Sequence, residues 1–218
     1  MRKGEPSEYR DRRYYGWVYH VLFDRALDVG RDAVVELVRE GSSVIDVACG
    51  TGDLCFALRR KKRCRVVGVD LSDRMLDFAA KHNPYEDVRF VKQDAADLKD
   101  FGPRSFDCAT VSLLLHELGR QARAQVAKEA LRVADRVVVM DWAAPLPRNL
   151  EGITVRLIEW AGRHHFRHFK DYLARGGLGG VLEDLGRPAS AIDRATLRRA
   201  CRHIVVIETP SGGRQDQQ

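Results

Sequence analysis

Glycines and carboxylates follow one another in this chain at spacings that suit a small-ligand site. An apolar stretch, Ser43 to Val47, runs into a turn that contains Gly50 and Gly52, and Asp46 stands four residues before the first of them. Glycine adopts dihedral angles closed to other residues and leaves no Cβ between chain and ligand, while a following helix offers free N–H groups. The pattern predicts a binding loop.

The residues around the loop narrow the choice of ligand. A dinucleotide fingerprint would need a third glycine at the position of Cys55, and the chain has none there. Asp46 would place negative charge beside a pyrophosphate, which is unfavourable. The sequence therefore favours a cationic ligand over NAD.

Carboxylates also end the next two predicted strands. Asp70 closes a strand that begins at Arg65 and lies eighteen residues beyond Gly52, the spacing of a ribose-binding acid. Asp94 follows the strand Val88 to Val91, where a carboxylate can accept from an adenine amino group. Each acid alone is often a strand-end or capping residue. Three acids at the ends of three consecutive strands favour a site for a nucleoside.

With these motifs, residues 35–145 resemble the class I S-adenosylmethionine-dependent methyltransferases. Within that class, Asp46 to Leu54 is most similar to the ubiquinone/menaquinone C-methyltransferase group, from which the region after Pro145 departs. The resemblance implies S-adenosylmethionine as cofactor and S-adenosylhomocysteine as product. The cofactor-binding residues that it implies are Asp46, Ala48, Gly50, Gly52, Asp70, Leu71, Asp94, Ala95, Ser112 and Tyr19.

Strands and helices alternate along the chain, which predicts an α/β fold with a doubly wound, mostly parallel sheet of the Rossmann-like methyltransferase type. Its carboxyl ends then share one edge, where ligands bind. A long helix is expected from Leu150 to Leu173, and the resemblance implies that Ala189 to Asp193 and His203 to Glu208 complete seven strands. The other predicted strands are Ser105 to Ser112 and Arg136 to Asp141, and the predicted helices are 31–39, Asp53 to Arg60 and Arg120 to Ala134.

The composition is that of a globular protein. The 218 residues are 44% hydrophobic and 31% charged, enough for one methyltransferase domain over 1–210 with a disordered tail at 211–218. An N-terminal helical cap with the first helix is expected at 1–40 and a helical lid insertion at 150–178. The apolar runs are too short for a membrane span or a secretion signal, so a cytoplasmic location is expected.

The charge and the cysteines exclude several other classes of site. Five single cysteines without a C-x-x-C pair indicate neither zinc nor a disulfide framework. His164 and His168 have metal-clamp spacing but no acidic third ligand, so no metal is expected. The net charge of +6 is densest at Arg59 to Arg63, where cations suit the end of a helix. No nucleic-acid partner is expected.

Two segments are candidates to close a chamber over the transferred methyl group. The N-terminal one carries the aromatic residues Tyr9, Tyr14, Tyr15, Trp17, Tyr19 and Phe23. It is either a cap, with Tyr15 as a catalytic candidate and Tyr19 on the same helical face, or a helix packed on the core. The second is the predicted lid, whose basic residues form either a solvated face or a surface that attracts an anionic substrate.

His116 is the main catalytic candidate. It follows Leu113 to Leu115 at the end of the fourth predicted strand, where relatives of the class place residues that face the methyl group. A neutral imidazole there can take a proton from the acceptor. The alternative is a histidine that only hydrogen-bonds the backbone. Asp141 and Trp142, which end the fifth predicted strand, are expected to line the same pocket.

Three functions remain open from the sequence. The first is a metal-free methyltransferase for a small molecule, with an anionic or aromatic acceptor, because no nucleic-acid module accompanies the core. The second is an RNA or protein methyltransferase, which the positive charge alone supports. The third is a catalytically silent protein that binds the cofactor. The sequence does not decide whether a carbon, nitrogen or oxygen atom is methylated. It also leaves the oligomeric state open.

Overall fold

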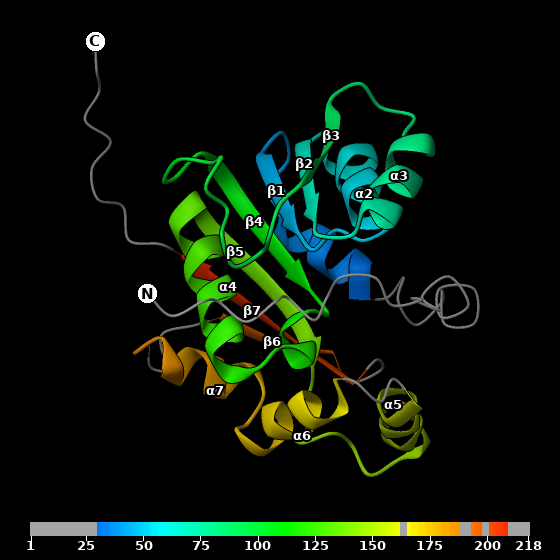
Figure 1. Cartoon of the computed structure of the whole chain (residues 1–218), viewed down its shortest axis with the longest axis vertical. Helices are drawn as coiled ribbons and strands as arrows, with labels where there is room; N and C mark the ends of the chain where they lie inside the picture. The colour runs from blue at the N-terminus through cyan, green and yellow to red at the C-terminus, as the bar shows by residue number, and fades with distance from the viewer. Residues whose placement is uncertain (1–29, 162–164, 188–192, 198–200, 209–218) are drawn as a thin grey trace, which may run out of the picture.

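The computed structural model describes residues 30–161, 165–187, 193–197 and 201–208. Within these ranges the chain forms a seven-stranded sheet in the order β3-β2-β1-β4-β5-β7-β6 (Figure 1). Strands β1 to β5 run parallel, and β7 is antiparallel to both of its neighbours. The α/β Rossmann-like fold with a mostly parallel sheet is confirmed.

The strands are β1 (Ser43–Val47), β2 (Arg65–Asp70), β3 (Val88–Lys92), β4 (Phe106–Ser112), β5 (Ala134–Trp142), β6 (Asp193–Leu197) and β7 (Arg202–Glu208). The helices are α2 (Asp53–Lys62), α3 (Asp73–Lys81), α4 (Arg120–Val133), α5 (Leu150–Ala161), α6 (Phe166–Ala174) and α7 (Leu178–Asp184), with a 3-10 turn η1 (Leu115–Glu117). Residues 30–37 are also helical.

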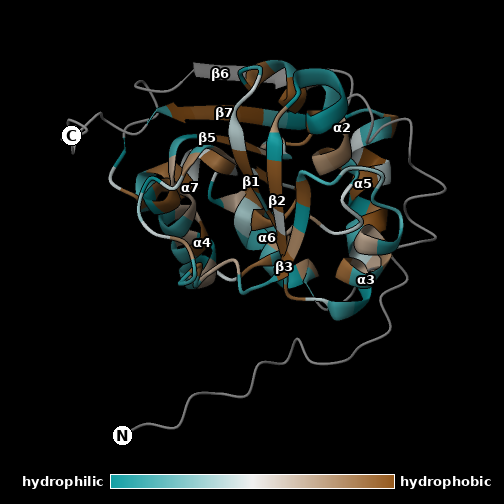
Figure 2. Ribbon diagram, turned by 90° about the horizontal axis from the view of Figure 1, so that it is seen from above, coloured by the Kyte–Doolittle hydropathy of each residue, from teal (hydrophilic) through white to brown (hydrophobic). Residues whose placement is uncertain are grey.

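Helices cover both faces of the sheet (Figure 2). One core joins α2 and the helical residues 30–37 to the strands, through side chains such as Val35 and Leu58. The other joins α4 and α7, through side chains such as Ala130 and Val181. Because both faces are covered, the central strands are almost continuously apolar, which is the pattern that made them predictable.

Two predicted elements differ from the structure. The single helix expected from Leu150 to Leu173 is divided into α5 and α6, and Gly162 lies in the sequence between them, outside the described residues. Glycine weakens a helix interior, so the sequence disfavours one continuous helix over this range. The strand expected at Ala189 to Asp193 differs at its end, because β6 continues to Leu197 and pairs with β7, with Leu197 opposite Arg202; residues 189–192 lie outside the described residues.

A helix that crosses a membrane must be both long and apolar. In the ranges that the structure describes, none combines the length and the apolar character needed to cross a membrane.

Candidate functional site

The predicted binding residues of the first four strands lie at the carboxyl edge of the parallel sheet. Asp46 of β1 is in register with Gly68 of β2 and Thr110 of β4, so these strands end level with one another. Ser112 closes β4 opposite Met140 of β5. Ligands of doubly wound sheets bind at this edge.

The glycine turn after β1 has an open side. Gly50 and Gly52 adopt φ angles of 53° and 82°. A Cβ at Gly52 would lie 2.7 Å from Cζ of Phe90, whereas a Cβ at Gly50 would meet nothing within 4 Å. Ala48 also has a positive φ, 59°, which costs a residue with a Cβ about 1–2 kcal/mol. The turn is thus strained at Ala48 and leaves space above Gly50.

Asp70 connects this turn to the end of β2. One carboxylate oxygen accepts a hydrogen bond from the Gly50 N–H at 2.9 Å, and the other accepts one from the Ser72 N–H at 2.9 Å. Each oxygen keeps a second lone pair for a ligand hydroxyl. Leu71, beside it, is 44% exposed. The arrangement offers a carboxylate and an apolar side chain to one ligand.

Asp46 is buried beneath the turn. It accepts hydrogen bonds from the Thr110 hydroxyl at 2.7 Å and the Cys55 thiol at 3.3 Å. Burial raises the pKa of Asp46 to about 6, although both hydrogen bonds lower it, and the nearby negative charge of Asp70 raises it further. A cation close to Asp46 would favour its charged form.

The end of β3 carries the third predicted acid. Asp94 is exposed, and its carboxylate accepts from the Ala96 N–H at 2.8 Å. Ala95 is half-buried. Before them, Gln93 is only 6% exposed. Its amide nitrogen and oxygen have no hydrogen-bond partner among the described residues, and neither does the buried hydroxyl of Ser112. Buried polar atoms without partners favour a bound ligand or water.

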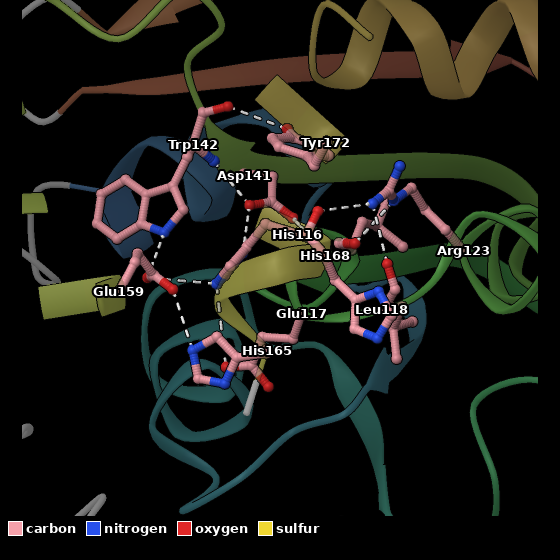
Figure 3. Close-up of polar contacts among 11 residues, drawn as sticks. His116, Glu117, Leu118, Arg123, Asp141, Trp142, Glu159, His165, His168 and Tyr172 are labelled. Carbon is pink, nitrogen blue, oxygen red and sulfur yellow. Dashed lines mark hydrogen bonds and ion pairs between the residues drawn. The ribbon is translucent and has the colours of Figure 1, made fainter. Parts of the chain in front are cut away.

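His116 lies in a buried network of charged groups (Figure 3). Its Nδ1 is 2.6 Å from the Asp141 carboxylate, whose other oxygen accepts the His116 backbone N–H at 3.1 Å. Its Nε2 is 3.5 Å from Glu159 of α5. Trp142 donates its indole N–H to Glu159 at 2.9 Å, and His165 Nε2 lies 3.1 Å from the same carboxylate. Both ring nitrogens of His116 therefore face carboxylates.

The network alters the charges of its members. Burial would lower the pKa of His116, but the negative charges and hydrogen bonds of Asp141 and Glu159 raise it well above its usual range. Burial would raise the pKa of Glu159, but the two histidines hold it at about 2. The hydrogen bond to Glu159 raises the pKa of His165. The network therefore favours the charged forms of Glu159 and of the two histidines that face it.

A buried arginine fixes the turn that carries His116. Arg123 of α4 donates to the Leu115 and Leu118 carbonyl oxygens, each at 2.9 Å, and to the His168 carbonyl oxygen of α6 at 3.3 Å. Its guanidinium lies over the ring of Tyr172. The interaction holds η1 and α6 together.

The described residues do not include every residue that the sequence predicts for the site. Tyr15 and Tyr19 lie outside the described residues, as does His164. Within the part of the chain that the structure describes, no group of His, Cys, Asp and Glu side chains is arranged to hold a metal ion. The helical segment that begins at Gly30 nevertheless reaches the site, because Arg31 lies 3.7 Å from Asp53 at the start of α2.

Glu159 and the role of His165 were missed by the sequence analysis. Glu159 shares one side of α5 with the buried residues Gly152 and Val155. Glu159 follows the apolar Val155 by four residues, so the two side chains share one face of a helix. That spacing indicates that the carboxylate lies on the buried face. Arg123 lies on the buried side of α4 in the same way.

The chain is similar to known proteins in sequence and in fold. Residues 44–136 match the family model described as a methyltransferase domain, and this segment holds the glycine turn, Asp70, Asp94 and His116. Over these residues the chain is similar to methyltransferase domains. A demethylmenaquinone methyltransferase of Thermotoga maritima is 32% identical over 140 residues, which are 60% of this chain and 60% of that protein. The chain thus covers less than two thirds of this relative.

Solved structures share the fold of the methyltransferase domain. An O-methyltransferase family protein from Burkholderia thailandensis has a TM-score of 0.64 at 18% identity, over 88% of this chain and 57% of that chain. The magnesium protoporphyrin IX methyltransferase of Synechocystis, solved with bound S-adenosylhomocysteine, has a TM-score of 0.54 at 20% identity, over 91% and 89%. These likenesses show that the fold of the chain is that of the two solved structures.

Proposed function

We propose that the protein transfers a methyl group from S-adenosylmethionine to a small molecule, without a metal. The observation that carries the proposal is the Asp70 carboxylate bonded to the Gly50 N–H, beside a turn whose Gly50 side is open. A carboxylate and an unobstructed backbone suit a ribose and the methionine part of the cofactor.

The residues at the sheet edge fit this cofactor. The unpartnered polar atoms of Gln93 and Ser112 offer hydrogen bonds there, and exposed Leu71 offers an apolar contact to an adenine ring. We assign the binding set as Asp46, Ala48, Gly50, Gly52, Asp70, Leu71, Asp94, Ala95, Ser112 and Tyr19. Asp46 is the assigned partner of the cationic part of the ligand.

The protein's contribution to the reaction is positioning and exclusion of water. The cofactor, when bound, supplies a methyl group already activated on a sulfonium, so placement of the acceptor can provide much of the acceleration. We assign closure to the N-terminal cap, which includes Tyr15, and to the lid insertion at 150–178. The contact of Arg31 with Asp53 supports the cap, because it brings the end of that segment beside the glycine turn.

His116 is the candidate for proton transfer from the acceptor. A charged imidazolium cannot accept a proton, and the network favours the charged form of His116. It can act as a base only after its Nε2 proton has left, and the carboxylate of Glu159 lies 3.5 Å away. An acceptor that ionises readily, such as a phenol or a carboxylic acid, would need no such step.

The basic residues between Arg59 and Arg63 favour a small-molecule acceptor over a nucleic acid, because most of them pair with acidic side chains of the protein. Arg59, Lys61 and Lys62 pair with acids at 2.7 Å, 2.7 Å and 3.3 Å, and Arg63 lies 3.8 Å from Glu40. Charges neutralised within the protein contribute little to phosphate binding. The proposal includes a cytoplasmic location, which suits the five free cysteines.

The test measures binding and transfer separately. Calorimetry with S-adenosylhomocysteine is expected to show binding in the presence of a chelator. A panel of quinols, phenols and carboxylic acids is then incubated with methyl-labelled cofactor, and label in a small-molecule product is expected. Binding of NAD in place of the cofactor would refute the assignment. Label in RNA or protein would favour an RNA or protein methyltransferase. Binding of the cofactor without any transfer would favour a catalytically silent binding protein.

A further inference from the structure

Glu159 joins three parts of the fold that are separate in sequence. The indole of Trp142 at the end of β5 donates to it at 2.9 Å, and His165, just before α6, lies 3.1 Å from its second oxygen. His116 in η1 lies 3.5 Å from the first. Figure 3 shows these side chains converging on the Glu159 carboxylate. One side chain of α5 thus contacts a strand end, a turn and the start of the next helix.

Among the residues that the structure describes, helix α5 makes few other contacts, one of which is the Cys201 thiol with the Glu151 carboxylate at 3.8 Å. Gly152, Val155 and Glu159 are its only buried residues. Leu150, Ile153, Leu157 and Trp160 are exposed by 50% or more on its other side. Val155 packs in a small cluster with Leu146 and Phe169. Because so little apolar surface of α5 is buried, the polar contacts of Glu159 carry much of its attachment.

The charges around Glu159 are balanced. Two histidines, His116 and His165, face it, and Asp141 holds the far side of the His116 ring. Glu117 of η1 lies 3.9 Å from His116 Nε2. The guanidinium groups of Arg123 on α4 and Arg202 on β7 also act on Asp141 or its neighbours. A buried carboxylate is retained at low cost only when it is paired and hydrogen-bonded in this way.

We infer that Glu159 and His165 are positioning residues, which clamp helix α5 through His116 onto the strand ends where methyl transfer is proposed. Glu159 is the centre of the clamp and the histidines are its charged partners. Removing the charge of Glu159 leaves the buried His116 and the half-buried His165 without their shared carboxylate, so α5 opens more often. The clamp exists without ligands, and only its link to turnover rests on the proposed function.

The test is hydrogen exchange of the whole protein, measured by mass spectrometry at neutral pH without ligands. Glu159→Gln keeps the size of the side chain and an acceptor for Trp142, but removes the charge. Amides of residues 150–161 are expected to exchange about tenfold faster or more, while those of β1 and β4 keep their wild-type rates, because local opening leaves the sheet intact. Arg156→Gln, an exposed residue whose side chain bonds to the Gly152 carbonyl oxygen of the same helix, is the matched control.

The result can overturn the inference in two ways. Wild-type exchange of residues 150–161 in Glu159→Gln would show that the clamp does not hold α5. Equal acceleration in β1 and β4 would show a general loss of stability instead. If Glu159→Gln does not fold by circular dichroism, His165→Gln provides the same test at a half-buried position and is judged by the same two results. Nuclear magnetic resonance titration of His116 is also expected to show a lower pKa in Glu159→Gln, which a merely packing role would not produce.

Turnover separates this inference from the proposed function. With a working acceptor, Glu159→Gln is expected to lower kcat/KM for the acceptor about tenfold or more, with the Kd for S-adenosylhomocysteine unchanged. Unchanged kcat/KM with faster exchange would refute the link to catalysis. The absence of methyl transfer by the wild-type protein would refute the proposed function and leave the exchange result standing.

Discussion

Asp70→Asn tests whether the carboxylate at the end of β2 binds the cofactor. In the structure its two oxygens accept the Gly50 and Ser72 N–H groups, each at 2.9 Å. Asparagine has one oxygen and one NH2 group, so one of these two N–H donors would face another donor. The substitution therefore removes the negative charge and weakens one of the two bonds that shape the turn.

The expected loss of binding follows from the hydrogen bonds. A hydrogen bond to a charged group contributes about 1.5–3 kcal/mol, which corresponds to roughly a 10- to 150-fold rise in Kd. Stability should fall as well, by about 1–3 kcal/mol, because one backbone N–H loses its acceptor. Asp73→Asn is the control, since Asp73 is an exposed acid that pairs with Lys92.

The assay is calorimetric titration with S-adenosylhomocysteine, with urea unfolding to check the fold. Asp73→Asn is expected to keep the wild-type Kd. An Asp70→Asn variant that folds and binds as tightly as the wild type would remove Asp70 from the site. It would also remove the main support for the proposed cofactor position.

Three further predictions concern other residues of the same edge. His116→Gln should retain cofactor affinity but lose about 10²- to 10⁴-fold in kcat if the imidazole takes the acceptor proton, and wild-type turnover would return it to a structural role. Gly52→Ala should lower the free energy of unfolding by roughly 1–3 kcal/mol, because its Cβ would overlap Phe90 at positive φ; unchanged urea unfolding would contradict this. Because the pKa of Asp46 is raised in the fold, its burial should destabilise the protein as pH rises towards about 6, by roughly 3 kcal/mol relative to Asp46→Asn. Urea midpoints of the two proteins that stay parallel between pH 4 and 7.5 would refute this.

The strand ends on which the proposed cofactor site rests could be predicted, because their signals are local. Asp46, Gly50 and Gly52 lie in one strand and turn, and Asp70 ends the next apolar strand. Parallel topology then brings such strand ends to one edge, so the fold follows once the alternation of strands and helices is recognised. Boundaries were less predictable, because β5 begins at Ala134, before the valine run that revealed it.

The acceptor side could be predicted only in part. His116 and Asp141 were noticed as strand-end residues, but their contact joins side chains 25 residues apart. Glu159 and His165 belong to a region that the sequence analysis treated as one polar helix. Glu159 belongs to α5 and His165 precedes α6, and the separation of the two helices lets the two side chains meet beside His116. No short-range sequence pattern specifies that packing.

The two sides of the sheet edge differ in how their carboxylates are satisfied, and the difference bears on function. Asp46, Asp70 and Asp94 accept from backbone N–H groups, a hydroxyl and a thiol, all neutral donors. Asp141 and Glu159 instead face imidazole rings. Neutral donors leave the first group with negative charge that can attract a sulfonium. The charges of the second group are already paired, so we expect the proposed cofactor to bind on the first side and the proposed acceptor on the second.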